Sequence, residues 1–224
     1  MNIENTAIDN LVVIDGEKYA TINQTPGITY YKEEVVKQGS IEYRVWSPFK
    51  SKLAAAFKKG LDPSILTNVK NILYLGASTG TTVSHLSDIL DKGVIYAVEI
   101  GPRVMMEFVN RVVKYRKNVV PLFFDARLPE SYVDIVDPPV DMVYCDVAQP
   151  DQTKILLDNA DLYLKNKGLA MIAIKARSID AVAPVKEIYH REIKYIESRG
   201  YEVREVIDLE PFEKEHALAV IIKP

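Results

Sequence analysis

The sequence predicts an α/β fold with a mostly parallel sheet, preceded by a small β domain. From about residue 70, short strand-like apolar segments alternate with longer segments of helical periodicity, which indicates a parallel sheet covered by helices. Residues 1–55 instead contain short β-branched and aromatic segments separated by turn signals. The last two expected strands have no helix between them, which predicts an antiparallel pair at the edge of the main sheet.

The first 55 residues are expected to form a small antiparallel β domain. Strands are expected where β-branched and aromatic residues concentrate, at 12–14, 18–22, 28–31 and 41–46. In the last of these, the residues expected on one face are Ile41, Tyr43 and Val45, and those on the other are Glu42, Arg44 and Trp46. A short helix over 51–59 follows and ends at Gly60.

The second domain is expected to comprise residues 56–224. The expected strands are 72–75, 94–98, 119–123, 141–145, 169–174, 201–209 and 217–222. The expected helices, read from apolar residues at helical spacing, are 82–90, 103–116, 152–164 and 184–198. Strand–helix alternation that ends in a strand pair is usual for S-adenosylmethionine-dependent methyltransferases. We therefore predict this Rossmann-like fold, with a mostly parallel seven-stranded sheet and a C-terminal antiparallel strand.

Composition and charge narrow the class of protein. The chain has 224 residues, of which 48% are hydrophobic and 26% charged, as in an average globular protein. It shows no apolar run of membrane-spanning length and no signal-peptide layout, and its single cysteine cannot form an internal disulfide. We expect a cytoplasmic protein with no membrane contact. The net charge of -3 argues against a stand-alone nucleic-acid binder, because phosphate contacts need clustered lysine and arginine.

The turn after the first expected parallel strand is a candidate ligand loop. Gly76 and Gly80 permit a tight turn and the close approach of a ligand. Glu99, Asp125 and Asp146 lie at or just after the ends of the next three strands, and the carboxyl ends of parallel strands share one edge of the sheet. Together they favour an adenosine-containing ligand. Taken singly, the loop can be a plain strand-to-helix turn and each acid a helix cap.

Four longer strings resemble the fibrillarin family. They are Ile41 to Ala56, Leu75 to Asp88, Asp146 to Gln152, which is the most specific, and Leu209 to Ala217. The resemblance covers roughly residue 28 to the C-terminus. The sequence lacks the Gly/Arg-rich tail of eukaryotic fibrillarins, so it looks like the archaeal form.

The resemblance implies an RNA ribose 2′-O-methyltransferase that uses S-adenosyl-L-methionine. Its targets would be rRNA and tRNA hydroxyls selected by a box C/D guide RNA, in pre-rRNA and tRNA processing. It also implies a ribonucleoprotein particle with a Nop-family scaffold protein in direct contact and a kink-turn-binding ribosomal-type protein. The mild acidity fits, because partners and guide would supply most of the RNA affinity.

The resemblance also implies the site residues. The catalytic set falls on Lys52, Asp146, Lys175 and His216. We expect Lys175 to act as the base, Asp146 to orient it and the methyl group, and His216 to help place the ribose. The expected cofactor contacts are Gly76, Ala77, Gly80, Thr81, Thr82, Glu99, Ile100, Asp125, Ala126, Asp146, Val147, Ala148 and Gln149. No metal site is expected.

Other interpretations stay open on the residues alone. Lys52 fits a solvated helix lysine, Lys175 a lysine that closes a buried strand, and His216 a surface histidine. Rival classes are a small-molecule O-methyltransferase, a particle subunit without catalysis and a nicotinamide oxidoreductase. The missing G-x-G-x-x-G fingerprint and the terminal strand pair argue against the last. A basic patch for phosphate is possible from Lys50, Lys52, Lys58, Lys59, Arg103, Arg127, Lys175 and Arg177.

Overall fold

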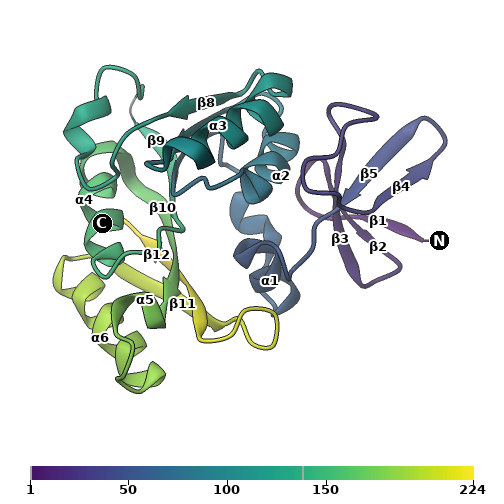
Figure 1. Cartoon of the computed structure of the whole chain (residues 1–224). Coiled ribbons are helices and arrows are strands. Elements are labelled where there is room, and N and C mark those ends of the chain that lie inside the picture. The colour runs from purple at the N-terminus through teal and green to yellow at the C-terminus, as the bar shows by residue number, and fades with distance from the viewer. Residues whose placement is uncertain (1, 138) are drawn as a thin grey trace.

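The computed structural model describes residues 2–137 and 139–224, which form two sheets joined through helix α1 (Lys52–Lys58) (Figure 1). The N-terminal sheet is antiparallel, with strand order β1-β2-β3-β5-β4. Its strands are β1 (Ile3–Asn5), β2 (Leu11–Ile14), β3 (Lys18–Ile22), β4 (Val35–Gln38) and β5 (Ile41–Val45). The predicted small β domain is confirmed in architecture.

The strand predicted over 28–31 was wrong. The backbone N–H groups of Tyr30 and Tyr31 donate to the Glu33 carboxylate, at 3.1 and 2.8 Å, and so do not enter a strand ladder. The missing strand is β4, where Val35 and Val36 pair with β5. The aromatic pair had suggested a strand, but a side-chain acceptor three residues away turned the segment into a loop.

The main sheet has the predicted seven strands, in the order β11-β12-β10-β9-β6-β7-β8. They are β6 (Asn71–Leu75), β7 (Val94–Val98), β8 (Val119–Leu122), β9 (Val140–Cys145), β10 (Leu164–Lys175), β11 (Glu202–Asp208) and β12 (His216–Ile222). β12 is antiparallel to both of its neighbours, and the other strands from β10 to β8 pair in parallel. This is the topology of the S-adenosylmethionine-dependent methyltransferase fold, as predicted.

Helices cover both faces of the main sheet (Figure 1). One face packs against α1, α2 (Thr81–Ile89) and α3 (Pro102–Arg111), and the other against α4 (Gln152–Tyr163) and α6 (Val185–Ser198). The helix predicted to reach residue 116 ends at Arg111 and continues as the 3₁₀ turn Val113–Tyr115. Short turns Pro63–Leu66 and Pro129–Tyr132 and the four-residue α5 (Ala176–Ile179) complete the described elements. Within the described residues, no helix is both long and apolar enough to cross a membrane.

A buried ionic network holds the N-terminal sheet against α2. The Asp88 carboxylate lies between two guanidinium groups, with Arg44 at 2.6 Å and Arg116 at 2.5 Å. Arg44 also donates to Glu33 at 2.6 Å, and the side chains of all these groups are at most 2% exposed. The alternation expected along β5 is thus real, but the face that carries Arg44 is buried against the second domain.

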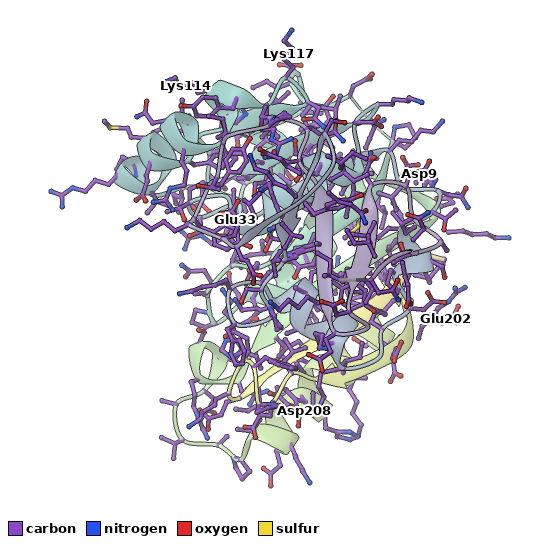
Figure 2. All side chains as sticks on the ribbon, turned by 90° about the vertical axis from the view of Figure 1, so that its right-hand side faces the viewer. Asp9, Glu33, Lys114, Lys117, Glu202 and Asp208 are labelled. Atoms are coloured by element: carbon purple, nitrogen blue, oxygen red, sulfur yellow. The ribbon has the colours of Figure 1, made fainter. Side chains whose placement is uncertain are left out.

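Trp46 and His85 form the aromatic part of the same interface. Their rings stack at a centroid distance of 4.9 Å, so Trp46 packs between the N-terminal sheet and α2. Both nitrogens of His85 are engaged, by Thr21 at 2.8 Å and by Tyr31 at 2.7 Å. Outside this interface, acidic and basic side chains are interspersed on the face of the N-terminal sheet (Figure 2).

Candidate active site

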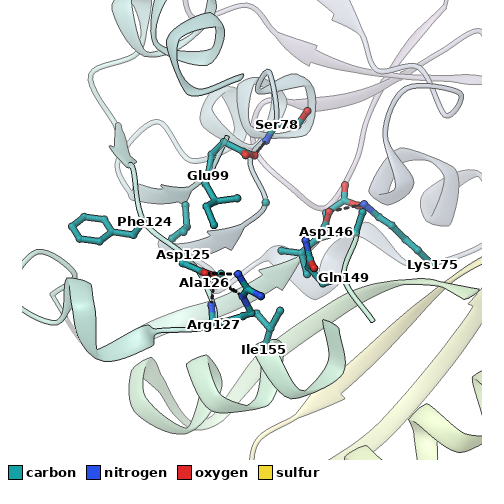
Figure 3. Close-up of a pocket in the computed structure, with 15 residues that line it drawn as sticks. Ser78, Glu99, Phe124, Asp125, Ala126, Arg127, Asp146, Gln149, Ile155 and Lys175 are labelled. Carbon is teal, nitrogen blue, oxygen red and sulfur yellow. Dashed lines mark hydrogen bonds and ion pairs between the residues drawn. The ribbon is translucent and has the colours of Figure 1, made fainter. Parts of the chain in front are cut away.

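A cavity of about 300 Å³ lies at the carboxyl ends of the parallel strands (Figure 3). Most of the residues predicted to hold a cofactor line it: Gly76, Glu99, Ile100, Asp125, Ala126, Asp146, Val147, Ala148 and Gln149. Ser78, Val98, Phe124, Arg127, Ile155 and Lys175 complete the lining. Apolar walls beside carboxylates suit a ligand that combines an aromatic base with ribose hydroxyls.

Glu99 connects two loops of this cavity. Its carboxylate accepts the N–H of Ser78 at 2.9 Å through one oxygen and the N–H of Gly101 at 2.8 Å through the other. The side chain is therefore fixed between the glycine loop and the start of α3. Each oxygen keeps a lone pair that can accept a ribose hydroxyl.

Asp125 has a partner that the sequence reading did not foresee. Arg127 binds its carboxylate through two nitrogens, at 3.1 Å from Nε to Oδ1 and 2.7 Å from Nη2 to Oδ2. The hydrogen bond from Arg127 lowers the pKa of Asp125, so the carboxylate remains ionised at neutral pH. Arg127 lines the cavity and had been considered only as a phosphate contact.

The two loop glycines serve different purposes. Gly76 has φ +81°, and a Cβ atom there would lie 3.0 Å from the backbone carbon of Asp146, so only glycine lets these two loops approach. Gly80 has φ +88°, and its missing side chain makes room for Phe108 of α3, 2.5 Å from an added Cβ. Gly80 is not among the residues that line the cavity, so it shapes the loop rather than the ligand surface.

A smaller cavity of about 180 Å³ adjoins the first, because both are lined by Gly76, Ser78, Asp146 and Lys175. Its other residues are Lys50, Lys52, Tyr74, Ala77, Thr79, Thr81 and Thr82, which include all the remaining predicted cofactor contacts except Gly80. Ser51, the N-cap of α1, bonds the Thr82 hydroxyl at 2.9 Å. This bond fixes the start of α1, and hence Lys52, against α2.

The centre of the smaller cavity is a carboxylate shared by two lysines. Oδ1 of Asp146 lies 2.8 Å from Nζ of Lys175 and 3.2 Å from Nζ of Lys52. Nζ of Lys175 also donates to the backbone carbonyl of Asp146 at 2.6 Å. One carboxylate between two lysines leaves the group with one excess positive formal charge. All three side chains are about 15% exposed, so the group still reaches solvent through the cavity.

His216 lies beside this group but does not join it. It pairs directly with Lys175 in the antiparallel register of β12 and β10. Its ring contacts the carbonyl oxygen of Lys214, with Nδ1 at 2.6 Å, and it lines neither cavity. The strand ends of the main sheet and the start of α1 therefore bring three of the four predicted catalytic residues into contact, and β12 places the fourth next to them.

Gln152 ends the Asp146–Gln152 string, and the sequence predicted no role for it. Its side chain is fully buried; Oε1 accepts the backbone N–H of Lys175 at 2.9 Å, and Nε2 donates to the carbonyl of Gln149 at 3.0 Å. One amide thus ties the end of β10 to the loop that follows Asp146. In the sequence, the only signal for this role is a glutamine at the start of a predicted helix. That position does not reveal that the side chain is buried or which backbone groups it binds.

The seven-stranded sheet, the glycine loop and the two joined cavities define a protein of the S-adenosylmethionine-dependent methyltransferase class. The family model described as fibrillarin matches residues 4–223. The chain therefore belongs to the fibrillarin family.

Relatives with known names and structures agree with this assignment. A fibrillarin-like rRNA/tRNA 2′-O-methyltransferase of Pyrobaculum neutrophilum is 49% identical over 209 residues, which cover 92% of this chain and 88% of the relative. The structure of Aeropyrum pernix fibrillarin with natively bound S-adenosyl-L-methionine has a TM-score of 0.89 and 40% identity, covering 99% of this chain and 98% of that one. A fibrillarin/Nop5p complex contains a chain with a TM-score of 0.86 and 37% identity, covering 98% and 100%.

Proposed function

We propose that this protein is an RNA ribose 2′-O-methyltransferase that takes its methyl group from S-adenosyl-L-methionine. The observation that carries the proposal is the Lys52–Asp146–Lys175 group at the junction of the two cavities. The larger cavity suits the adenosine part of the cofactor, and the smaller one suits the reacting atoms. The relative with bound S-adenosyl-L-methionine and the relatives' names support the same assignment.

The residues of the larger cavity would hold the cofactor by contacts of known type. Glu99 would accept the ribose hydroxyls, and Ile100 and Phe124 would flank the base, with Asp125 at its edge. Loop residues Gly76 and Ala77 would leave room for the methionine part. When bound, S-adenosyl-L-methionine supplies a methyl group that its sulfonium already activates.

The protein then has two tasks, which are alignment and removal of one proton. A ribose hydroxyl is a poor nucleophile until a base shares its proton. We assign this role to Lys175, which must act as the neutral amine, while Lys52 keeps the Asp146 carboxylate compensated. Asp146 orients Lys175, and His216, its neighbour across the strands, helps place the ribose. Alignment in a fixed site supplies much of the acceleration.

The assembly is part of the proposal. The fibrillarin/Nop5p complex supports a Nop-family scaffold in direct contact with this chain. A box C/D guide RNA would select the rRNA or tRNA nucleotide, and a kink-turn-binding protein would complete a cytoplasmic particle. The net charge of -3 favours this division of labour, because the chain alone offers phosphate little attraction. The domain division after residue 55 also remains a proposal, and it falls inside α1.

The test is transfer of labelled methyl from S-adenosyl-L-methionine to an RNA paired with a box C/D guide. We expect labelling of one 2′-hydroxyl, only with guide and Nop-family partner present. Tight cofactor binding without RNA labelling would contradict the RNA assignment and leave a different methyl acceptor, such as a small molecule. No cofactor binding would contradict the enzyme assignment itself.

A further inference from the structure

A third cavity lies between the N-terminal sheet, the segment that follows it and the loop before β12. Its volume is about 520 Å³, larger than either cavity of the candidate active site. The aromatic side chains that line it are Tyr19, Tyr31, Trp46, Phe49 and Phe212. Phe49 and Phe212 meet edge to face at a centroid distance of 5.2 Å, yet Phe49 is 63% exposed. An aromatic ring this exposed beside a cavity offers a surface for a flat or apolar group.

The charges around this cavity favour an anion. Its acidic residues Glu33 and Glu34 are paired, with Arg44 at 2.6 Å and Lys18 at 2.8 Å. The remaining charged residues of the lining are three lysines, Lys32, Lys50 and Lys58, and one acid, Glu17. Lysines beside exposed aromatic rings are the combination that binds a nucleotide, with phosphate on the ammonium groups and the base or ribose on the ring.

The cavity and the candidate active site are neighbours. Lys50 lines both this cavity and the smaller catalytic one. In the sequence, Phe49 precedes Lys50 and Ser51, and Lys52 follows them. The Ser51 hydroxyl is hydrogen-bonded to the Thr82 hydroxyl, which fixes this segment against α2. A strand of RNA whose target ribose reaches Lys175 would therefore pass Lys50 with its next phosphate.

We infer that this aromatic and basic cavity binds the nucleotide next to the target nucleotide, with its phosphate at Lys50 and its ribose against Phe49, while its base stays paired with the guide. The inference rests on the proposed function. Phe49 is thus a positioning residue, which acts by holding the RNA and touches none of the reacting atoms. A peptide segment of a partner protein is the competing occupant.

Cross-linking in the assembled particle identifies the occupant. The substrate RNA carries a photoreactive thiouridine directly next to the target nucleotide, and the adducts are mapped by mass spectrometry. We expect adducts within the segment that contains Trp46, Phe49 and Lys50. Adducts confined to the partner proteins or to other surfaces of this chain, in a particle that still methylates its target, would overturn the inference.

Kinetics of Phe49→Ala give an independent test. We expect the KM for substrate RNA to rise roughly tenfold, because the nucleotide loses its contact with the aromatic ring. The kcat and the affinity for S-adenosyl-L-methionine should stay unchanged, and Phe49→Tyr should restore the KM. Met106→Ala, which removes a side chain 66% exposed on α3, is the matched control.

The outcomes separate this inference from the proposed function. An unchanged KM for Phe49→Ala, with the wild type fully active, would overturn the role of the cavity alone. A wild-type particle that transfers no methyl group would overturn the proposed function. Trp46 is the single tryptophan, so its fluorescence shows whether the variant keeps the native surroundings of the cavity.

Discussion

Two carboxylates in this protein each lie between two cations, yet their surroundings are opposite. Asp88 binds Arg44 and Arg116 at the domain interface, where all the side chains are at most 2% exposed. Asp146 binds Lys52 and Lys175 at the end of the main sheet, where the side chains are about 15% exposed and face two cavities. The same arrangement of charges thus occurs once in a fully buried interface and once beside a solvent-accessible cavity.

The difference separates stability from catalysis. Guanidinium groups stay charged and bind carboxylates through fixed planar geometry, so the Asp88 network is suited to hold two domains together. Lysine amines can lose a proton and move on flexible stems, so the Asp146 group can take part in proton transfer. Removing one member should therefore damage the fold in the first group and the reaction in the second.

The largest effect is expected for Lys175→Ala. Loss of a general base typically lowers a rate by about 10²- to 10⁴-fold, so we expect a fall of this size in the single-turnover rate of methyl transfer. Lys165→Ala is the matched control, since Lys165 lies near the other end of the same strand and pairs with Asp141. A Lys175→Ala protein with full transfer activity would rule out the base assignment.

Gln152→Ala should give an intermediate effect on the catalytic group. The variant loses the bonds that fix the backbone of Lys175 and Gln149, so we expect roughly a tenfold loss in kcat, the equivalent of about 1.4 kcal/mol. The KM for RNA should stay constant, and Gln152→Glu should restore part of the rate through the retained acceptor. The control is Thr153→Val, because the buried Thr153 hydroxyl has no hydrogen-bond partner among the described residues. A rise in KM with unchanged kcat would contradict the positioning role.

A smaller effect is expected from pH at the domain interface. Burial lowers the pKa of His85 well below its ordinary value of 6.5, and Arg44 and Arg116 lower it further. Below pH 6.5 the unfolded chain therefore takes up a proton that the folded chain does not, so stability falls as the pH falls. His85→Gln should remove up to about 1.4 kcal/mol per pH unit from the slope of unfolding free energy between pH 6 and 5.

The control for that slope is His190→Gln, which replaces an exposed histidine on α6. The free energy of unfolding of the wild type, His85→Gln and His190→Gln is measured by denaturant unfolding at a series of pH values. Equal slopes for the wild type and His85→Gln would show that His85 does not titrate across folding.

The main sheet was predictable because most of its strands contain short apolar runs and its helices carry a clear apolar period. The N-terminal sheet was less predictable, because β4 has only Val35 and Val36 as a signal and the aromatic residues of 28–31 form a loop. Tertiary contacts decided that segment: the Glu33 side chain binds the backbone locally and pairs with Arg44 of β5. Local propensity does not contain this information.

The site was predictable where residues follow strand ends. Asp146 and Lys175 end neighbouring strands, so their contact follows from the topology. The ion pair of Asp125 with Arg127 and the bonds of Gln152 were not predictable, since they depend on rotamers and loop paths. The buried setting of His85 was missed for the same reason, because its partners come from the other domain.

The most direct test makes the same substitution in both groups, Asp88→Asn and Asp146→Asn, and measures thermal stability and methyl transfer for each. We predict that Asp88→Asn loses about 3–5 kcal/mol of stability, because the buried Arg116 loses its counter-ion and Arg44 keeps only Glu33, and that it keeps its transfer rate per folded molecule. Asp146→Asn should keep its melting temperature within a few degrees and lose transfer by about 10²-fold or more. A stable but inactive Asp88→Asn protein, or an unstable but active Asp146→Asn protein, would contradict the separation of stability from catalysis.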